Sequence, residues 1–272
     1  MPHKFFLISK PGTDYHLGEY WREEEMEEHL RLCDHETTLG VYLESLPRDA
    51  RILDAGCGAG RWMIFLRRKG FDVLGMDRSP EGLSRAREFD PGIRVAAGDV
   101  AYKPFRDASF GALLSSGVVE HFEEGPAQAL AEARRVLAPG GLLLVAVPYN
   151  SPLRRFFYNP VTSLIRIVSR ALGTKWEFAE YRFTAREMRR VLDRAGFQWE
   201  GAFPDDYREP KAKGIWVDYN QALGARGRMW ELNAAGRVVQ KLFNAISPWL
   251  SCAGVLCVVR KPGPPPPEHD HT

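Results

Sequence analysis

The sequence RILDAGCGAGR, at residues 51–61, decides the fold of this chain of 272 residues. It begins with apolar residues that are typical of a buried strand and continues with three alternating glycines, Gly56, Gly58 and Gly60. Residues 62–68 then show a helix-like pattern. Glycines permit positive φ and let a ligand approach the backbone closely, and the start of a helix presents free N–H groups. Together, the strand, turn and helix predict the opening of a nucleotide-binding α/β unit.

The spacing of the glycines distinguishes two kinds of nucleotide site. A dinucleotide site requires G-x-G-x-x-G, whereas here the third position holds Arg61 and the last glycine comes one residue early. This departure disfavours an NAD-type oxidoreductase, which stays an alternative. Residues 53–60, LDAGCGAG, instead resemble the first motif of class I S-adenosylmethionine-dependent methyltransferases.

Acidic residues end the next two predicted strands. Residues 71–77, FDVLGMD, end in Asp77, which lies 21 residues after Gly56, close to the spacing at which an acid meets the ribose hydroxyls of a nucleotide. The alternative role of Asp77 is a strand-end turn or a helix N-cap. Residues 93–99 end in Asp99, and the block from 98 to 110 resembles the "GD…LPF…SFD" block of the same family. Outside such a block, Asp99 would be an ordinary turn residue.

Two further motifs extend the resemblance. A fourth strand at residues 112–116 is followed by GVVEHF, which resembles the "EH" signature of the family. Residues 135–148, RVLAPGGLLLVAVP, give a turn and a fifth, buried strand. Strands that alternate with helices predict a parallel sheet with right-handed crossovers and a ligand crevice at the carboxyl ends of the strands. We expect a Rossmann-like, seven-stranded, mostly parallel sheet with helices on both faces.

The second half of the chain completes this sheet and adds segments to it. Residues 197–203 and 254–261 predict strands six and seven, and Thr184 with Glu187 predicts a capping box before strand six. Residues 1–18 show no regular pattern. The expected organisation is an N-terminal helical flap (1–48), a methyltransferase domain (49–203 and 254–261) with a lid-like insertion (151–183), a helical insertion (204–253) and a disordered tail (262–272).

Composition excludes several classes of protein. With 44% hydrophobic and 26% charged residues and a net charge of +2, the chain is typical of a globular protein and gives no electrostatic reason to expect nucleic-acid binding. The four cysteines form no C-x-x-C pair, so we expect thiols in a reducing compartment and no metal site. No apolar run approaches the roughly 18 residues needed to cross a bilayer. We expect a cytoplasmic protein without a transmembrane segment, and its oligomeric state stays open.

The resemblance implies S-adenosylmethionine as the cofactor and S-adenosylhomocysteine as its product. Glycine backbone would pass under the methionine portion, Asp54 would help to fix its ammonium group, Asp77 the ribose and Asp99 the adenine. The residues expected to bind the cofactor are Asp54, Gly56, Cys57, Gly58, Gly60, Asp77, Arg78, Gly98, Asp99, Val100, Ser116 and Gly117.

Catalytic and substrate residues are expected near the ends of strands four and five. The histidine side chain suits a general base at neutral pH, so His121 is a catalytic candidate, although the histidine of this signature often bonds to backbone instead. Tyr149 is the second catalytic candidate, and it and Asn150 are equally suited to capping the turn after strand five. The residues expected to contact substrate are Tyr20, Trp21, Glu120, Asn150, Tyr181 and Arg182.

The implied reaction is methyl transfer to O, N or C of a small, partly apolar molecule, as in methyltransferases of ubiquinone and menaquinone biosynthesis. A non-catalytic protein that binds the cofactor or its product is a second alternative. The apolar stripe from Val238 to Leu250 fits core packing, an oligomer interface or a membrane surface, of which the first two are favoured. No nucleic-acid partner is expected.

Overall fold

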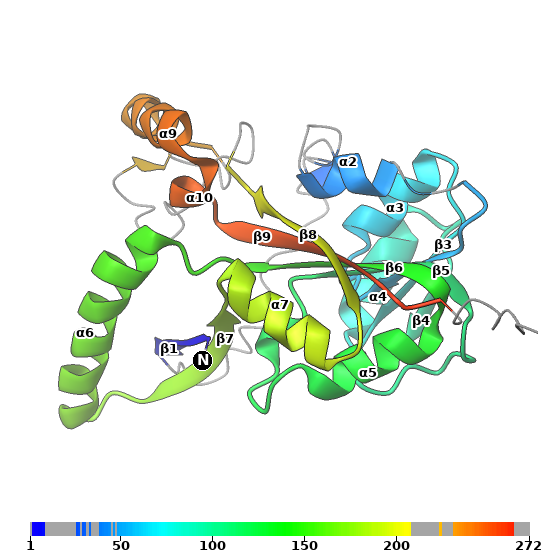
Figure 1. Cartoon of the computed structure of the whole chain (residues 1–272), viewed down its shortest axis with the longest axis horizontal. Coiled ribbons are helices and arrows are strands. Elements are labelled where there is room, and N and C mark those ends of the chain that lie inside the picture. The colour runs from blue at the N-terminus through cyan, green and yellow to red at the C-terminus, as the bar shows by residue number, and fades with distance from the viewer. Residues whose placement is uncertain are drawn as a thin grey trace, which may run out of the picture.

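The computed structural model describes residues 2–8, 26–27, 29–30, 33, 38–44, 46, 48–207, 223–224 and 231–263. Its centre is a seven-stranded sheet with the strand order β4-β3-β2-β5-β6-β9-β8 (Figure 1). The strands are β2 (Ile52–Ala55), β3 (Val73–Asp77), β4 (Val95–Ala97), β5 (Phe110–Ser116), β6 (Leu137–Pro148), β8 (Gln198–Asp205) and β9 (Gly254–Arg260).

The pairing of the strands confirms the expected α/β fold. β2 pairs in parallel with β3 and with β5, and β3 with β4 and β5 with β6 are also parallel. β9 is antiparallel to both of its neighbours, β6 and β8. The strand order reverses between β2 and β5, and in open parallel sheets a ligand crevice forms at the carboxyl ends of the strands beside such a switch point.

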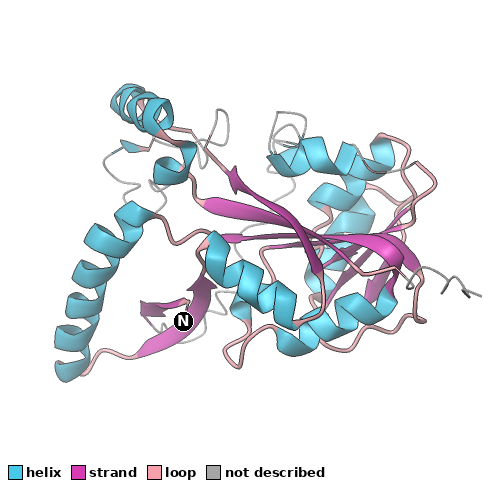
Figure 2. Ribbon diagram, in the orientation of Figure 1, coloured by secondary structure: helices cyan, strands magenta, loops and turns pink. Residues whose placement is uncertain are grey.

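Helices cover both faces of this sheet, as expected (Figure 2). Successive side chains of a strand point to opposite faces, so Ile52 and Leu53 enter different apolar clusters. The first cluster includes residues of α2 (Thr38–Glu44), α3 (Arg61–Arg68) and α4 (Pro80–Phe89). The second includes residues of α5 (Ala127–Val136) and α7 (Ala185–Arg194).

A separate two-stranded sheet lies beside the carboxyl end of β6. β1 (His3–Ile8) pairs antiparallel with β7 (Trp176–Arg182). The expectation of irregular structure in residues 1–18 was therefore wrong for residues 3–8. These residues form a strand because they pair with β7, which is distant in sequence. A short π-helical segment, η2 (Arg154–Tyr158), leads from β6 into α6 (Asn159–Ala171).

The described N-terminal helical residues pack on the main sheet. Met26, Leu30 and Cys33 are buried in the first apolar cluster, and the Tyr42 and Phe203 rings have centroids 4.8 Å apart. Tyr20 and Trp21 lie outside the described residues. Before β9 come α9 (Ala234–Ile246) and α10 (Pro248–Ser251). In the part of the chain that the structure describes, no helix is long and apolar enough to span a membrane.

Candidate functional site

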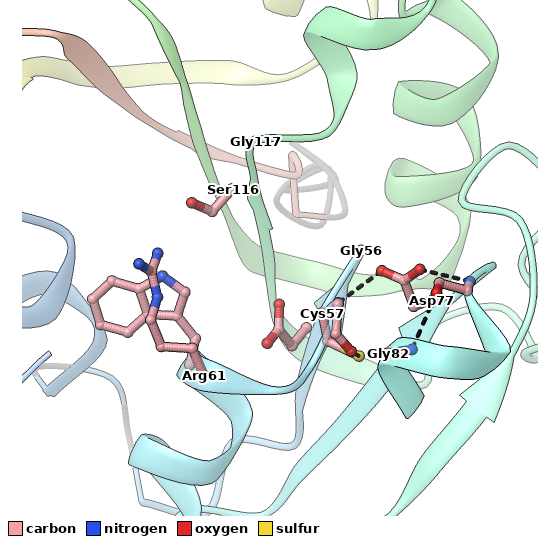
Figure 3. A pocket seen from close by; sticks show the side chains of 11 residues that line it. Gly56, Cys57, Arg61, Asp77, Gly82, Ser116 and Gly117 are labelled. Atoms are coloured by element: carbon pink, nitrogen blue, oxygen red, sulfur yellow. Dashed lines mark hydrogen bonds between the residues drawn. The ribbon is translucent and has the colours of Figure 1, made fainter. Parts of the chain in front are cut away.

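A cavity of about 170 Å³ opens at the carboxyl ends of β2, β3 and β5, beside the switch point (Figure 3). In Figure 3 the glycine loop and Asp77 lie on one side of it, and Arg61 and Ser116 on the other. It is lined by Asp54, Gly56, Cys57, Gly58, Arg61, Trp62, Asp77, Ser79, Gly82, Ser116 and Gly117. Seven of these residues were expected from the sequence to bind a cofactor, and the fold brings them together from three strands.

The backbone of the glycine loop after β2 adopts a conformation, and packs so closely, that a side chain at Gly56 would not fit. Gly56 has φ +89°, and a Cβ built on it would lie 2.3 Å from Cγ2 of Val118. The backbone N–H groups of Gly56 and Cys57 both donate to the carbonyl oxygen of Met76, at 2.7 and 3.0 Å. The loop is thereby held across the end of β3 and leaves its surface open to the cavity.

Asp77 ends β3 and connects three elements. Its Oδ2 accepts a hydrogen bond from the Gly58 N–H at 2.7 Å, and its Oδ1 accepts one from the Ser79 N–H at 2.8 Å. The N-cap of α4 is Ser79, whose hydroxyl accepts from the Gly82 N–H at 3.1 Å. The carboxylate therefore lies at the cavity and organises its wall at the same time.

Asp54 is the buried acid of the cavity. Its side chain is shielded from solvent, and its Oδ2 has no hydrogen-bond partner. Burial raises the pKa of Asp54 to about 7, against the opposing effects of the Arg61 charge and a backbone N–H. A buried acceptor without a partner is costly, so the site is built to receive a donor or a cation from a ligand.

Four lining residues were not among the residues expected from the sequence: Arg61, Trp62, Ser79 and Gly82. Arg61 begins α3, and its guanidinium lies 5.1 Å from the centre of the Trp62 ring. Gly82 permits α4 to approach the loop, because a Cβ there would lie 3.1 Å from the Gly58 backbone. The signals for Ser79 and Pro80 as a helix start were present in the sequence, but their proximity to the glycine loop is a tertiary feature.

The other expected cofactor residues lie around the cavity, not in its lining. Gly60 is the N-cap of α3, with φ +86°. Asp99 follows β4, is exposed, and accepts a hydrogen bond from the Ala101 N–H at 2.7 Å. The Gly98 N–H donates to the Asp77 carbonyl, Val100 is buried, and Arg78 is exposed.

Glu120 is buried beside the cavity in η1 (Val119–His121). A Cβ built on Gly117, which lines the cavity, would lie 3.9 Å from Oε1 of Glu120. Its Oε2 has no hydrogen-bond partner, and burial raises the pKa of Glu120 to about 8, with Glu180 adding to the rise. The group therefore titrates near neutral pH, as general acids and bases do.

The two residues proposed from the sequence as catalytic have other neighbours. Nδ1 of His121 lies 2.8 Å from the carbonyl oxygen of Ala179 in β7. This bond places a proton on Nδ1 and ties η1 to β7. The Tyr149 ring packs on the Trp249 ring, with centroids 5.1 Å apart. Neither residue is in the lining of the cavity.

Of the residues expected to contact substrate, Asn150 follows β6 and lines a second hollow, between β1 and α6, whereas Tyr181 and Arg182 belong to β7. Asn150 is buried, accepts a hydrogen bond from Asn159 Nδ2 at 2.9 Å, and lines a space of about 540 Å³. The Tyr181 hydroxyl donates to the Glu123 carbonyl at 2.8 Å. Arg182 is buried, pairs with Glu180 at 3.0 Å, and stacks 3.9 Å from the centre of the Phe5 ring.

The residues of the first cavity fit the expected cofactor, S-adenosylmethionine. That molecule carries an α-ammonium group, a ribose diol and an adenine ring. The unpartnered Oδ2 of Asp54 is a suitable acceptor for a cation, and the glycine loop lacks the Cβ atoms that would fill the space beside it. The acids Asp77 and Asp99 follow neighbouring strands at the same edge of the sheet.

Comparison with known proteins identifies methyltransferases as relatives of this chain. Residues 53–145 match a family model described as "Methyltransferase domain". Demethylmenaquinone methyltransferase of Chlorobaculum tepidum is 30% identical over 168 residues, which cover 58% of this chain and 69% of that protein. A protein of Mycolicibacterium smegmatis named as a probable S-adenosylmethionine-dependent methyltransferase is 30% identical over 152 residues, 55% of this chain and 52% of that protein. The chain thus spans only about half the length of several curated relatives.

Solved structures show the same fold. An S-adenosylmethionine-dependent methyltransferase of Methanosarcina mazei matches with a TM-score of 0.56 and 18% identity, over 82% of this chain and 98% of that one. A methyltransferase of Haloferax volcanii, solved with its Trm112 activator, matches with a TM-score of 0.58 and 18% identity, over 88% and 95%. With the motifs, the sheet order and these relatives together, the chain belongs to the class I S-adenosylmethionine-dependent methyltransferases.

Proposed function

We propose that this chain transfers a methyl group from S-adenosylmethionine to an O, N or C atom of a small, partly apolar molecule. The observation that carries the proposal is the buried carboxylate of Asp54, whose Oδ2 has no hydrogen-bond partner, beneath a glycine loop at the switch point of the sheet. In this proposal Asp54 receives the ammonium group, Asp77 the ribose hydroxyls and Asp99 the adenine amino group. Bound S-adenosylmethionine supplies a methyl group that is already activated by a sulfonium.

The protein would then contribute mainly alignment, which supplies on the order of 7–11 kcal/mol at best. A nucleophile that carries a proton also benefits from a base, worth about 10²–10⁴-fold. We assign this role to Glu120, because it is buried beside Gly117, has an unpartnered oxygen and has a pKa raised to about 8. His121 is the weaker candidate, because its Nδ1 is bonded to Ala179.

The hollow between β1 and α6 suits the acceptor. It consists of a polar space of about 540 Å³ and an apolar space of about 490 Å³, and both are lined by His3, Lys4, Ser163 and Arg166. Among the residues that the structure describes, none in either lining carries a carboxylate. The apolar space is also bounded by Phe5, Phe6 and Ile165. These linings support an acceptor with an apolar portion and an anionic group.

Two arginine charges act on His3 in the hollow. Burial lowers the pKa of His3, and the charges of Arg182 and Arg166 lower it further. Asn150, just after β6, lines the hollow, and Ser116, at the end of neighbouring β5, lines the cofactor cavity. The two spaces therefore lie side by side at the carboxyl ends of these strands. An acceptor in the hollow would face the cofactor across those strand ends.

The first test measures binding and transfer separately. Thermal unfolding with S-adenosylmethionine, S-adenosylhomocysteine and NAD should show stabilisation by the two adenosyl ligands only, by about 2.7 kcal/mol at 100 times Kd. Transfer of radiolabelled methyl should then be screened over acceptors that are matched in size but differ in charge and apolar content. A response to NAD alone would overturn the assignment of the cofactor.

A non-catalytic binding protein is the second candidate function. It is distinguished by tight binding of the adenosyl ligands together with no transfer to any acceptor class. Transfer to any acceptor that Glu120→Gln slows by tenfold or more would exclude it.

A further inference from the structure

The described surface has one concentrated set of exposed apolar side chains. Of the large hydrophobic residues that are exposed in the described part of the chain, all except Ile8 and Tyr102 belong to η2, α6 with its C-cap, or α9. They are Phe156, Phe157, Val161, Leu164, Ile165, Ile167, Val168, Leu172, Val238, Leu242 and Ile246. Leu172 is 81% exposed and Ile246 75%, so these residues contribute little to the core.

The two helices lie at one end of the molecule, on the left in Figure 1, away from α3 and α4. They are connected by packing, because Leu153, which precedes η2, belongs to the same small cluster as Leu232, Val239 and Phe243. The apolar stripe of α9 is therefore divided. Its Val239 and Phe243 face the protein, whereas Val238, Leu242 and Ile246 face solvent.

The charges among these residues are all of one sign. Residues 151–175 contain four arginines and one lysine and no acid, and residues 232–251 contain Arg237 and Lys241 and again no acid. Arg155, Arg170, Lys175, Arg237 and Lys241 are exposed. α7 offers a comparison within the same chain, because it is also arginine-rich, yet it includes Glu187 and Asp193 and exposes no large apolar residue.

We propose that η2–α6 and α9 dock the protein on an anionic lipid surface. A helix that lies in the membrane interface combines exposed large apolar side chains with Lys and Arg on its flanks. Because residues 151–175 and 232–251 contain no Asp or Glu, they would not repel the anionic headgroups of a lipid surface. A second copy of the chain is the less suitable occupant, because its identical face would place like charges against each other.

The length and position of α6 are consistent with docking on a lipid surface. Its 13 residues span about 20 Å, enough to lie along the headgroup region but too short to cross a bilayer. One side of α6 lines the hollow that we assign to the acceptor, through Thr162, Ser163 and Arg166. Ile165 and Arg155 also border this hollow. The docking proposal does not depend on the acceptor assignment, since it rests on the other exposed residues of η2 and α6, among them Val161, Leu164 and Val168.

The test uses the full chain and two vesicle compositions, phosphatidylcholine alone and phosphatidylcholine with phosphatidylglycerol in equal parts. We expect flotation with the anionic vesicles, weak binding to the neutral ones, and release by high salt. Arg170→Gln with Lys175→Gln should weaken binding about 25-fold, at about fivefold for each cation. Leu164→Glu with Val168→Glu should abolish it.

The matched control is Arg186→Gln with Arg190→Gln on α7, which removes the same charge from a helix without exposed apolar residues and should leave flotation unchanged. Stabilisation by S-adenosylhomocysteine shows that each variant is folded. Binding that is absent from anionic vesicles, or equal in the α6 and α7 variants, overturns the proposal. A dimer in sedimentation analysis that Leu164→Glu with Val168→Glu dissociates overturns it in favour of a second copy.

Discussion

The carboxylate of Asp77 accepts a hydrogen bond from the backbone N–H of Gly58 at 2.7 Å, which joins the end of β3 to the glycine loop that follows β2. Its second oxygen accepts from the Ser79 N–H, just before α4. The spacing of Asp77 in the sequence favoured a ribose-binding role over a local structural one. In the folded chain the carboxylate has structural partners as well, so loss of this side chain alone would not identify its ligand contact.

We expect Asp77→Asn to weaken binding of S-adenosylhomocysteine by about 10- to 150-fold, since hydrogen bonds to a charged group contribute roughly 1.5–3 kcal/mol. Calorimetric titration measures this loss. An analogue of S-adenosylhomocysteine that lacks both ribose hydroxyls separates the contact with the ligand from the role of Asp77 in the loop. If Asp77 binds those hydroxyls, the substitution should cost much less with that analogue. An equal loss with both ligands would assign Asp77 to the loop alone.

The buried Asp54 predicts cofactor binding that depends on pH. Its pKa of about 7 lies far above the ordinary 3.8, mainly because of burial, so the carboxyl is largely protonated below neutral pH in the free protein. A ligand ammonium would favour the ionised form. Binding then releases a proton, and affinity should rise by up to about tenfold per pH unit between about pH 5 and 7.

Titration in buffers of different ionisation enthalpy measures the released proton directly. The window lies below the ordinary pKa of an α-amino group, about 7.7–8.0, so the ligand keeps its charge throughout. Asp54→Asn should lose both the pH dependence and the proton release. A variant that retains the slope would place the titrating group elsewhere.

Gly56 and Gly70 provide a matched pair for the shape of the loop. Both have positive φ, +89° and +86°, but a Cβ on Gly56 would meet Val118 at 2.3 Å, whereas nothing lies within 4 Å of one on Gly70. Gly70→Ala should therefore cost only backbone strain, about 1–2 kcal/mol. Gly56→Ala should cost more and should also abolish cofactor binding.

Chemical denaturation measures both stability changes. Adding Val118→Ala to Gly56→Ala removes the methyl groups nearest to the new Cβ and should restore part of the lost stability. If Gly56→Ala is no more destabilising than Gly70→Ala, then Val118 moves aside and the loop is less constrained than its geometry indicates.

Much of the main sheet was predictable because each element carries a local marker. Gly70 ends α3 in the left-handed region, Pro80 begins α4, and the capping box of Thr184 and Glu187 is present as expected. Asp54 and Asp77 line one cavity because parallel strands place their carboxyl ends at one edge of the sheet. Local pattern and fold agree here, so the sequence was a sufficient guide.

The features that escaped prediction depend on distant contacts. β1 is stabilised by β7, and no turn joins these strands to reveal their pairing. The stripe on α9 was recognised, but periodicity does not tell which side faces the protein, and this is decided by tertiary packing of Val239 and Phe243 in the cluster around Leu232. Likewise, the sequence pointed to Glu120 as a substrate residue but gave no sign of its desolvation, which arises from the surrounding fold.

Glu120 leads to the last prediction, which concerns stability. Burial raises the pKa of its carboxyl from 4.5 to about 8, so the folded protein binds a proton that the unfolded chain releases between those values. The free energy of unfolding should therefore fall as pH rises through this window, by at most about 1.4 kcal/mol per pH unit. The Gln side chain of Glu120→Gln is neutral without binding a proton, so this variant should lack this part of the decline. At pH 8 the variant should therefore be more stable than wild type.

The same measurement with two ligands tests where Glu120 lies relative to the reaction. S-adenosylmethionine and S-adenosylhomocysteine differ by a methyl group and the positive charge on sulfur. A cation close to Glu120 favours its ionised form and lowers its pKa. The pH-dependent decline in stability should thus be smaller with S-adenosylmethionine than with S-adenosylhomocysteine in wild type, and the two should coincide in Glu120→Gln. If the two ligands give the same slope in wild type, the carboxyl is too far from the sulfonium to accept a proton from the methyl acceptor.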